Sequence, residues 1–430
     1  MSVDTQPCVP IEPQAPAPRR YAAVEAGEIP VVVHPREGTP EVTDTPDALR
    51  AVVARFAASH APVALDVERA GSFRYSDSAC LVQIRREDVG TALIDTIALP
   101  DLSPLAPALS NAVWILHAAD QDLASLAEVG LHPPQLFDTL IAARLLGYER
   151  FGLAAVCQSM LGVTLDKNHQ NSNWSTRPLP RSWLRYAALD VELLTDIYRE
   201  QGRELYRVGR WEWCEQECEH ERTLPLPTPD PQRWRHLPGA GKIRNPRQLA
   251  VLEELWLTRE RIARDTDQAP TRLIKHATLV ELAVNPPRRR RQLLAHPQLR
   301  SPRARAHTDE WLSAIARGLN RSRHDLPPVA LPSHGERIPP PGLWKISERA
   351  AFDRLQCLKR HIRHVADALG IDQAMLLDPA LQRRIAWHSL AFRGSELRDY
   401  LAHHGARPWQ INEVGDAVDA AIADFDSLTQ

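Results

Sequence analysis

The sequence predicts an α/β domain with a mixed sheet followed by two all-α bundles, and three observations carry this prediction. Between residues 62 and 119, short apolar runs rich in β-branched residues alternate with turn residues, which is typical of strands. After Asp120 the apolar residues recur at helical spacing. Proline-rich stretches around 224–232 and 325–342 then divide the helical part, because proline cannot continue a helix interior.

Length and composition fit such a multidomain protein. The 430 residues exceed one compact domain at roughly 150 residues each. With 43% hydrophobic and 25% charged residues, the composition is ordinary for a soluble globular protein and excludes wholesale disorder, collagen-like chains and coiled coils. No run approaches the ~18 consecutive apolar residues of a membrane span, and no basic-then-apolar signal segment opens the sequence. We therefore expect a cytoplasmic protein without a membrane partner.

The order of elements divides the chain into six expected segments. The first 40 residues hold eight prolines and no sustained periodicity, which favours a flexible tail. An Asn245 cap with Pro246 at the first helical position marks a helix start in the first bundle. The expected boundaries are a tail over 1–40, an α/β domain over 41–222, a linker over 223–236, a helical domain over 237–322, a proline-rich linker over 323–346 and a second helical domain over 347–430.

Positive charge is concentrated in the first helical domain. The whole chain has a net charge of -2, whereas residues 237–325 hold 18 Lys and Arg against 9 Asp and Glu. Such segregation indicates a polyanionic partner, although a solvated basic surface is the ordinary alternative. The densest clusters are Arg288–Arg291 and the trio Arg300, Arg303 and Arg305.

Other chemical motifs are weaker. The six cysteines lack the regular spacing of a disulfide framework, so reduced thiols are expected. Cys214, Cys218 and His220 could ligate zinc, but without a fourth partner nearby a free cysteine pair is favoured, and their role stays open. The stretch Gly239–Lys242 is similar to a phosphate loop but lacks its first glycine and its final Ser or Thr, so no nucleotide-triphosphate site is expected.

Four acidic residues stand on expected strands and helices of the α/β domain. Asp66 and Glu68 lie two apart on a strand, so they share one face and either pair with cations, coordinate a hard metal or form a surface pair. Asp122 follows a later strand, where the helix dipole alone favours an acid. Tyr186 and Asp190 are one helical turn apart, as a core-edge tyrosine and a solvated acid would also be.

Taken together, the D-x-E pair, the later Asp and the Y-x3-D pair resemble the motifs of DEDD exonucleases of the tyrosine subclass. The supporting stretches are DVERAGSFRYSDSACLVQI, KNHQNSNWSTRPLP and RYAALDV. The domain order resembles the ribonuclease D family, in which helical HRDC domains follow an RNase H-like catalytic domain. The resemblance covers about residues 40–215 for the nuclease, 237–322 for an HRDC domain and 347–428 for an HRDC-like domain.

Two positions depart from the family pattern. Arg69 follows the D-x-E pair where relatives often carry an aromatic residue, and Asn173 stands where Asp is expected. Neither change removes a metal ligand. They therefore bear on fine positioning and leave the expected reaction class as it is.

The resemblance implies a phosphodiester hydrolase that uses two divalent cations, Mg²⁺ with Mn²⁺ as a substitute. By resemblance, Asp66 bridges both ions, Glu68 and Asp190 complete the site of the attacking water, and Asp122 holds the second ion. Tyr186 orients that water. The implied enzyme is a 3'-to-5' exoribonuclease that releases 5'-nucleoside monophosphates from RNA 3' ends, with tRNA precursors as substrates in tRNA 3' maturation.

The basic first helical domain is expected to bind RNA through phosphate contacts, which supply affinity without reading sequence, and whether the second helical domain also binds RNA is left open. The oligomeric state is not predicted. The expected substrate-binding residues are His117, Lys167, His169, Gln170, Arg177, Arg288, Arg289, Arg290 and Arg291.

Two other functions remain open. A DNA exonuclease, similar to proofreading or helicase-associated domains, would use the same acids, although the chain has no polymerase or helicase body. An RNA-binding protein with an inactive nuclease site is the third hypothesis, and the intact acids at all four positions argue against it.

Overall fold

The computed structural model describes residues 29–165, 169–226, 228, 230–329, 338–388 and 392–429. Residues 1–28 of the expected tail lie outside these ranges, but residues 29–40 are ordered. There β1 (Val31–Val32) pairs in parallel with β8 (Thr164–Leu165), and Glu37 forms an ion pair with the buried Arg85. The expected tail is therefore wrong for this part, because strand pairing and ion pairing outweigh the flanking prolines. No helix within the described ranges is long and apolar enough to span a membrane.

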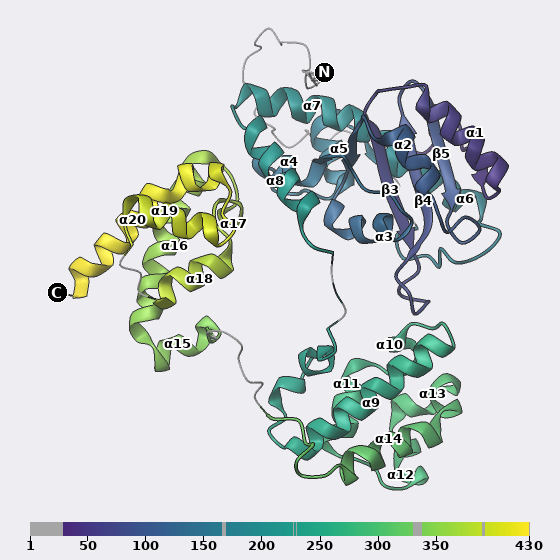
Figure 1. Cartoon of the computed structure of the whole chain (residues 1–430), viewed down its shortest axis with the longest axis vertical. Helices are drawn as coiled ribbons and strands as arrows, with labels where there is room; N and C mark the ends of the chain where they lie inside the picture. Colours follow the sequence, from purple (N-terminus) through teal and green to yellow (C-terminus); the bar gives the residue numbers. More distant parts are fainter. Residues whose placement is uncertain are drawn as a thin grey trace, which may run out of the picture.

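A mixed sheet forms the core of the first domain (Figure 1), in the order β2 (Val42–Thr43), β5 (Gly90–Asp95), β4 (Ala79–Arg86), β3 (Val63–Arg69), β6 (Val113–Leu116) and β7 (Gln135–Asp138). The strands β3, β4 and β5 are antiparallel neighbours, and the other pairs are parallel. The predicted α/β domain with a mixed sheet is confirmed.

The strand β3 carries the D-x-E pair through the middle of this sheet, between β4 and β6. Its residue Asp66 lies opposite Gln83, and Glu68 lies opposite Leu81. A register shift follows directly between Glu68 and Arg69. Such β-bulges bend a strand and redirect its side chains, and they are frequent beside active sites.

In the described residues of this domain there are eight α-helices, and two of them bear on the site. The helix α6 (Arg181–Glu192) packs against β3, β4 and β5. The helix α4 (Thr139–Leu145) begins where the Asp138 side chain accepts the Leu140 N–H at 2.7 Å. The others are α1 (Pro46–Ala57), α2 (Ala106–Leu109), α3 (Leu123–Glu128), α5 (Leu153–Leu161), α7 (Leu194–Arg207) and α8 (Trp211–Thr223).

The first helical unit has its own core. Its longest helix, α9 (Pro246–Asp265), begins as predicted, because the Asn245 side chain accepts the Arg247 N–H at 2.9 Å. The remaining helices are α10 (Pro270–Leu273), α11 (His276–Val284), α12 (Arg290–Ala295), α13 (Pro302–Ala306) and α14 (Thr308–Asn320). The helices α9 and α14 pack along each other around the fully buried Trp311.

The second helical unit shares a hydrophobic core with the α/β domain. The rings of Trp213 on α8 and Trp409 are stacked with centroids 4.6 Å apart. The Glu217 carboxylate on α8 also accepts hydrogen bonds from Arg407 (2.7 Å) and from the Trp409 indole (2.6 Å). The helices of this unit are α15 (Pro341–Ser347), α16 (Arg349–Leu369), α17 (Gln373–Leu376), α18 (Pro379–His388), α19 (Gly394–His403) and α20 (Pro408–Thr429).

The five described cysteines are buried free thiols. The sulfur atoms of Cys214 and Cys218 lie 3.9 Å apart on α8, and the Cys218 sulfur accepts the Asp138 N–H at 3.3 Å. In the described part of the chain, no third metal-ligating group closes a site around this pair. The favoured free cysteine pair therefore agrees with the structure.

Candidate active site

One strand and one helix bring three acids together. Asp66 and Glu68 project from β3, and Asp190 projects from α6, which packs on that strand. Each offers a carboxylate oxygen, and these three oxygens lie within 4.8 Å of one another. Glu68 is buried, whereas Asp66 and Asp190 remain partly accessible. The arrangement can hold a hard cation with oxygen ligands.

The pKa values of the three clustered acids are raised, which favours the binding of a cation. Burial raises the pKa of Asp66 to about 6. Burial, followed by repulsion from Asp66, Asp190 and Asp122, raises the pKa of Glu68 to about 11. The pKa of Asp190 also rises well above its usual value through burial and the neighbouring Asp66. Each raised pKa means that the ionised carboxylate has too little positive charge around it. A bound cation would therefore stabilise the ionised form of all three groups.

The fourth acid stands at the rim of this cluster. Asp122 is 5% exposed at the start of α3, and its pKa is raised by burial and then by the charge of Asp66. The turn that carries it is held by Asp138, whose oxygens accept the N–H groups of Ala118 (3.0 Å) and Ala119 (2.7 Å). This brace was not predicted from the sequence, although Asp138 directly precedes a helix, where an N-cap acid is common.

Tyr186 lies against Asp190 as the helical spacing predicts. Its hydroxyl hydrogen-bonds the Asp190 carboxylate, and burial followed by the nearby acids raises the pKa of the phenol above its usual range. The phenol therefore stays protonated at neutral pH. The His169 ring meets the Tyr186 ring edge-on at 5.8 Å, which places this expected substrate-binding residue beside the site.

A cavity of about 430 Å³ opens next to the acids. Glu68, Arg69 and the loop after β3 form one side, and residues 170–172 form the other. Gln170 and Glu68 therefore line the same cavity, and the role of Gln170 in substrate approach stays a prediction. Lys167 lies outside the described residues.

Two other expected contact residues are engaged elsewhere. His117 hydrogen-bonds the Thr139 hydroxyl through Nδ1 at 2.8 Å, and burial lowers its pKa. Arg177 grips both oxygens of Asp95 (2.5 and 2.7 Å) and donates to the Cys80 carbonyl at 2.8 Å. The Arg177 guanidinium thus anchors the segment before α6, and its expected place along the substrate approach stays a prediction.

The arginine cluster of the first helical unit lies apart from the acids. Arg288, Arg289, Arg290 and Arg291 are all exposed, and Arg290 pairs with Asp309 at 2.8 Å. In Figure 1, α12 occupies the end of its unit farthest from the sheet, whereas α10 faces the sheet. An RNA that contacts both the acid cluster and the arginine cluster therefore has to extend along the first helical unit.

The loop after β3 also touches the first helical unit, which sequence reasoning missed. Arg74 forms an ion pair with Asp267, and Arg272 donates to the Ser72 carbonyl at 2.7 Å. The Phe73 carbonyl accepts a further N–H from the turn before α10 at 3.0 Å. No sequence signal marks these contacts, because they join residues about 200 positions apart.

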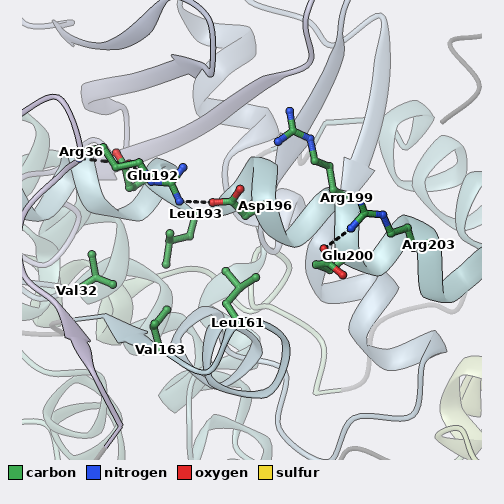
Figure 2. A pocket seen from close by; sticks show the side chains of 10 residues that line it. All are labelled: Val32, Arg36, Leu161, Val163, Glu192, Leu193, Asp196, Arg199, Glu200 and Arg203. Atoms are coloured by element: carbon green, nitrogen blue, oxygen red, sulfur yellow. Dashed lines mark hydrogen bonds and ion pairs between the residues drawn. The ribbon is translucent and has the colours of Figure 1, made fainter. Parts of the chain in front are cut away.

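Two other features of the surface do not include the predicted acids. A cavity of about 470 Å³ lies between β1 and α7 (Figure 2), where Arg36 pairs with Asp196 and Arg203 pairs with Glu200. In the second helical unit, Cys357, His361 and Asp424 also offer ligand atoms within 4.8 Å of one another. These side chains already have partners within the protein. His361 pairs with Asp424 at 2.8 Å, and the Cys357 thiol donates to a backbone carbonyl.

Comparisons with known families agree with this geometry. Residues 40–205 match a family described as a 3'-5' exonuclease, and residues 248–315 match the HRDC domain. Residues 337–422 match a family described as the C-terminal domain of a 3' to 5' exonuclease. The second helical unit, expected to be HRDC-like, therefore matches a family with a different description.

Individual relatives extend the match over most of the chain. Ribonuclease D of Nitrobacter hamburgensis is 30% identical over 302 residues, covering 68% of this chain and 77% of that protein. The crystal structure of a protein from Bifidobacterium adolescentis is 33% identical with a TM-score of 0.82, covering 92% of this chain and 100% of that one. The structure of Escherichia coli RNase D, described as an exoribonuclease involved in structured RNA processing, is 26% identical with a TM-score of 0.65, covering 87% and 98%. This chain belongs to the ribonuclease D family of 3'-to-5' exoribonucleases.

Proposed function

We propose that Asp66, Glu68, Asp122 and Asp190 hold two divalent cations with which this exoribonuclease removes the last nucleotide of an RNA chain. Exonucleases of this family use divalent metals. The observation that carries the proposal is the convergence of three carboxylate oxygens within 4.8 Å. The raised pKa values of these acids also support bound cations, because a hard divalent ion offsets the negative charge of closely spaced carboxylates.

The four acids are suited to different tasks. Asp66 is the common neighbour, because its charge acts on Glu68, Asp122 and Asp190 alike. Asp66 would therefore contribute to holding both cations, with Glu68 and Asp190 helping to hold one and Asp122 the other. When bound, Mg²⁺ or Mn²⁺ would polarise the attacking water and the phosphate and offset charge on the leaving 3' oxygen.

Tyr186 positions the attacking water. Its hydroxyl donates to Asp190 and keeps its proton, so its oxygen remains able to accept a hydrogen bond from water. The ring is held by Trp174 and His169 at 6.2 and 5.8 Å, which fixes the direction of the hydroxyl. The chemistry requires no side-chain nucleophile.

The RNA substrate we propose is a structured one, with tRNA precursors as the class. Support comes from the Escherichia coli relative, whose description names structured RNA processing. The first helical unit adds a basic surface of the kind that holds phosphates. His169 and Gln170 would contact the last nucleotides, because they lie beside the acids.

The test is hydrolysis of a 5'-labelled RNA and a DNA of equal sequence, in Mg²⁺ and in EDTA. We expect shortening of RNA from its 3' end in Mg²⁺ only, with nucleoside 5'-monophosphates as product. Asp66→Ala should abolish turnover and leave RNA binding intact, and Tyr186→Phe should slow turnover by roughly 10²-fold. Tyr206→Phe, at an exposed tyrosine on α7, is the matched control.

Each other outcome identifies a competing function. Preference for DNA would indicate a DNA exonuclease. Equal inactivity with and without metal, together with tight RNA binding, would indicate a binding protein. Wild-type turnover in Asp66→Ala would refute the assignment of the site.

A further inference from the structure

Arg69 lies inside the acid cluster, although strand alternation would place it elsewhere. Adjacent residues of a regular strand point to opposite faces, so Arg69 should face away from Glu68. The register shift between these two residues interrupts the alternation. As a result, the Arg69 guanidinium reaches Asp122 at 3.4 Å and donates to the Gln121 carbonyl.

Arg69 supplies the positive charge that the cluster otherwise lacks. Among the residues that the structure describes, Asp122 forms its ion pair with Arg69, and Asp66, Glu68 and Asp190 form none. The arginine therefore occupies, next to Asp122, a place where a metal ion would also be attracted. An arginine and a cation repel each other at such short range, so both cannot share the same carboxylate oxygen.

The same guanidinium borders the cavity through which RNA would approach. Arg69 lines that cavity together with Gly71 and Gln170, and its side chain is 24% exposed against 7% for Asp122. Because Arg69 both pairs with Asp122 and lines the cavity, rotation about the bonds of its long side chain can turn the guanidinium from Asp122 towards the cavity. Its planar fork of donors matches two oxygens of a phosphate group.

We propose that Arg69 alternates between two partners, namely Asp122 in the free enzyme and a phosphate oxygen near the 3' end of the RNA when Asp122 faces a metal ion. The proposal rests on the proposed function, because it takes Asp122 as a metal ligand. Arg69 thereby contacts the substrate and delays full metal loading until RNA arrives. An aromatic residue at this position, as relatives often carry, can do neither.

The two partners predict effects of opposite sign when Arg69 is replaced. Without the guanidinium, Asp122 is free, so metal should bind more tightly in the absence of RNA. The phosphate loses its partner, so RNA should bind more weakly. A purely structural role would weaken both, because a disordered site holds neither ligand well.

The experiment compares Arg69→Gln and Arg69→Lys with wild type and with Arg50→Gln, which removes a 72%-exposed arginine on α1. Free Mn²⁺ is measured by electron paramagnetic resonance without RNA, and KM and kcat are measured with a labelled RNA at saturating Mn²⁺. For Arg69→Gln we expect about three- to tenfold tighter Mn²⁺ binding at the weaker site and a KM raised by a similar factor. Arg69→Lys should restore wild-type Mn²⁺ affinity, and most of the KM.

The outcomes separate this inference from the proposed function. If wild type and Arg50→Gln hydrolyse RNA but Arg69→Gln shifts both affinities in the same direction, or neither, the alternation is refuted and the nuclease site stands. If wild type binds no Mn²⁺ and leaves RNA intact, the proposed function fails first. Circular dichroism of each variant establishes that the fold is retained.

Discussion

At the scale of single residues, the acids of the site make the free energy of unfolding depend on pH in a metal-dependent way. The pKa of Asp66 is raised to about 6 in the fold, whereas an unfolded Asp has a pKa of about 3.9. The folded state therefore holds more protons than the unfolded state between these values, so stability falls as pH rises through this window. Glu68, raised to about 11, extends the same trend through neutral pH.

We therefore expect the Tm of the metal-free protein to fall between pH 5 and pH 8, and to fall less in Asp66→Asn, which cannot ionise there. Added Mn²⁺ should raise the wild-type Tm more at pH 8 than at pH 5, because protons compete with the metal for the same oxygens. Differential scanning calorimetry at matched ionic strength measures both effects. A Tm difference between wild type and Asp66→Asn that does not change with pH would contradict the raised pKa.

Spacing predicts which side chains of the site share a face, whereas the resemblance to DEDD exonucleases was needed to single them out as metal ligands. The interval of two on a strand aligns Asp66 with Glu68, and the interval of four on a helix aligns Tyr186 with Asp190. The same rule fails for Arg69, because a β-bulge is set by tertiary packing and has no sequence signature here. The same limit applies to Arg177, whose hydrogen bonds to Asp95 and to the Cys80 carbonyl have no sequence signature because these partners are more than 80 positions away.

At the scale of elements, the turn between β6 and α3 determines where Asp122 points. Ala118 adopts a left-handed conformation (φ 60°), which an L-residue rarely adopts without tertiary support. That support is the Asp138 carboxylate, 1% exposed, which accepts the N–H groups of Ala118 and Ala119 in the bend and of Leu140 at the start of α4. A residue of the next strand thus positions a proposed metal ligand that it does not touch.

Asp138→Ala should therefore reduce turnover and stability together. The buried N–H groups of Ala118 and Ala119 and the part-buried N–H of Leu140 lose their acceptor, and each of the two buried groups costs about 1–3 kcal/mol when left unsatisfied. The free Asp122 turn should then weaken Mn²⁺ binding. Asp101→Ala is the matched control, because Asp101 accepts the Ser103 N–H at 2.9 Å in an exposed turn and is not one of the proposed site residues. Thermal unfolding and Mn²⁺ titration of both variants are the measurements. Unchanged Mn²⁺ affinity in a folded Asp138→Ala protein would remove the positioning role.

The elements themselves were predictable where apolar periodicity is strong, and less so where contacts are distant. The strands around Asp66 and the capped start of α9 follow from local patterns. The pairing of β1 with β8 does not, because two-residue strands carry little periodicity and join positions more than 130 residues apart. The prolines beside β1 predicted a flexible tail, because local composition does not indicate a strand partner far along the chain.

At the scale of the whole molecule, the two helical units relate differently to the α/β domain. The second unit continues the hydrophobic core across α8, so Trp213 and Trp409 stack within one contiguous cluster. The first unit has a separate core and touches the α/β domain chiefly through the polar loop after β3. The linkers were visible as proline-rich segments, but which unit docks tightly depends on surfaces that no local pattern reports. Removing the second unit would expose apolar surface on α8, so it cannot test RNA binding cleanly.

Point substitutions on α12 and just before it test the basic surface without that difficulty. Arg288, Arg289 and Arg291 are exposed, and Arg290, which pairs with Asp309, can be left in place. The triple change to Gln should weaken binding of a long RNA and lower its salt slope by about 0.7 per lost phosphate contact, as for a single strand. Hydrolysis of a trinucleotide should stay at the wild-type rate, because α12 lies at the far end of its unit (Figure 1).

The matched comparison removes Arg349, Arg360 and Arg363 from α16, which lowers the charge by the same amount on the other helical unit. Fluorescence anisotropy between 50 and 300 mM salt gives both slopes. If the salt slope becomes smaller in the α12 variant alone, the first helical unit binds the RNA phosphates. The slope is smaller in that case because fewer phosphate contacts release fewer counterions on binding. Equal salt slopes in wild type and the α12 variant would refute a phosphate-binding role for this surface. Equal decreases of the slope in both variants would mean that the net charge of the protein, not a particular unit, attracts RNA.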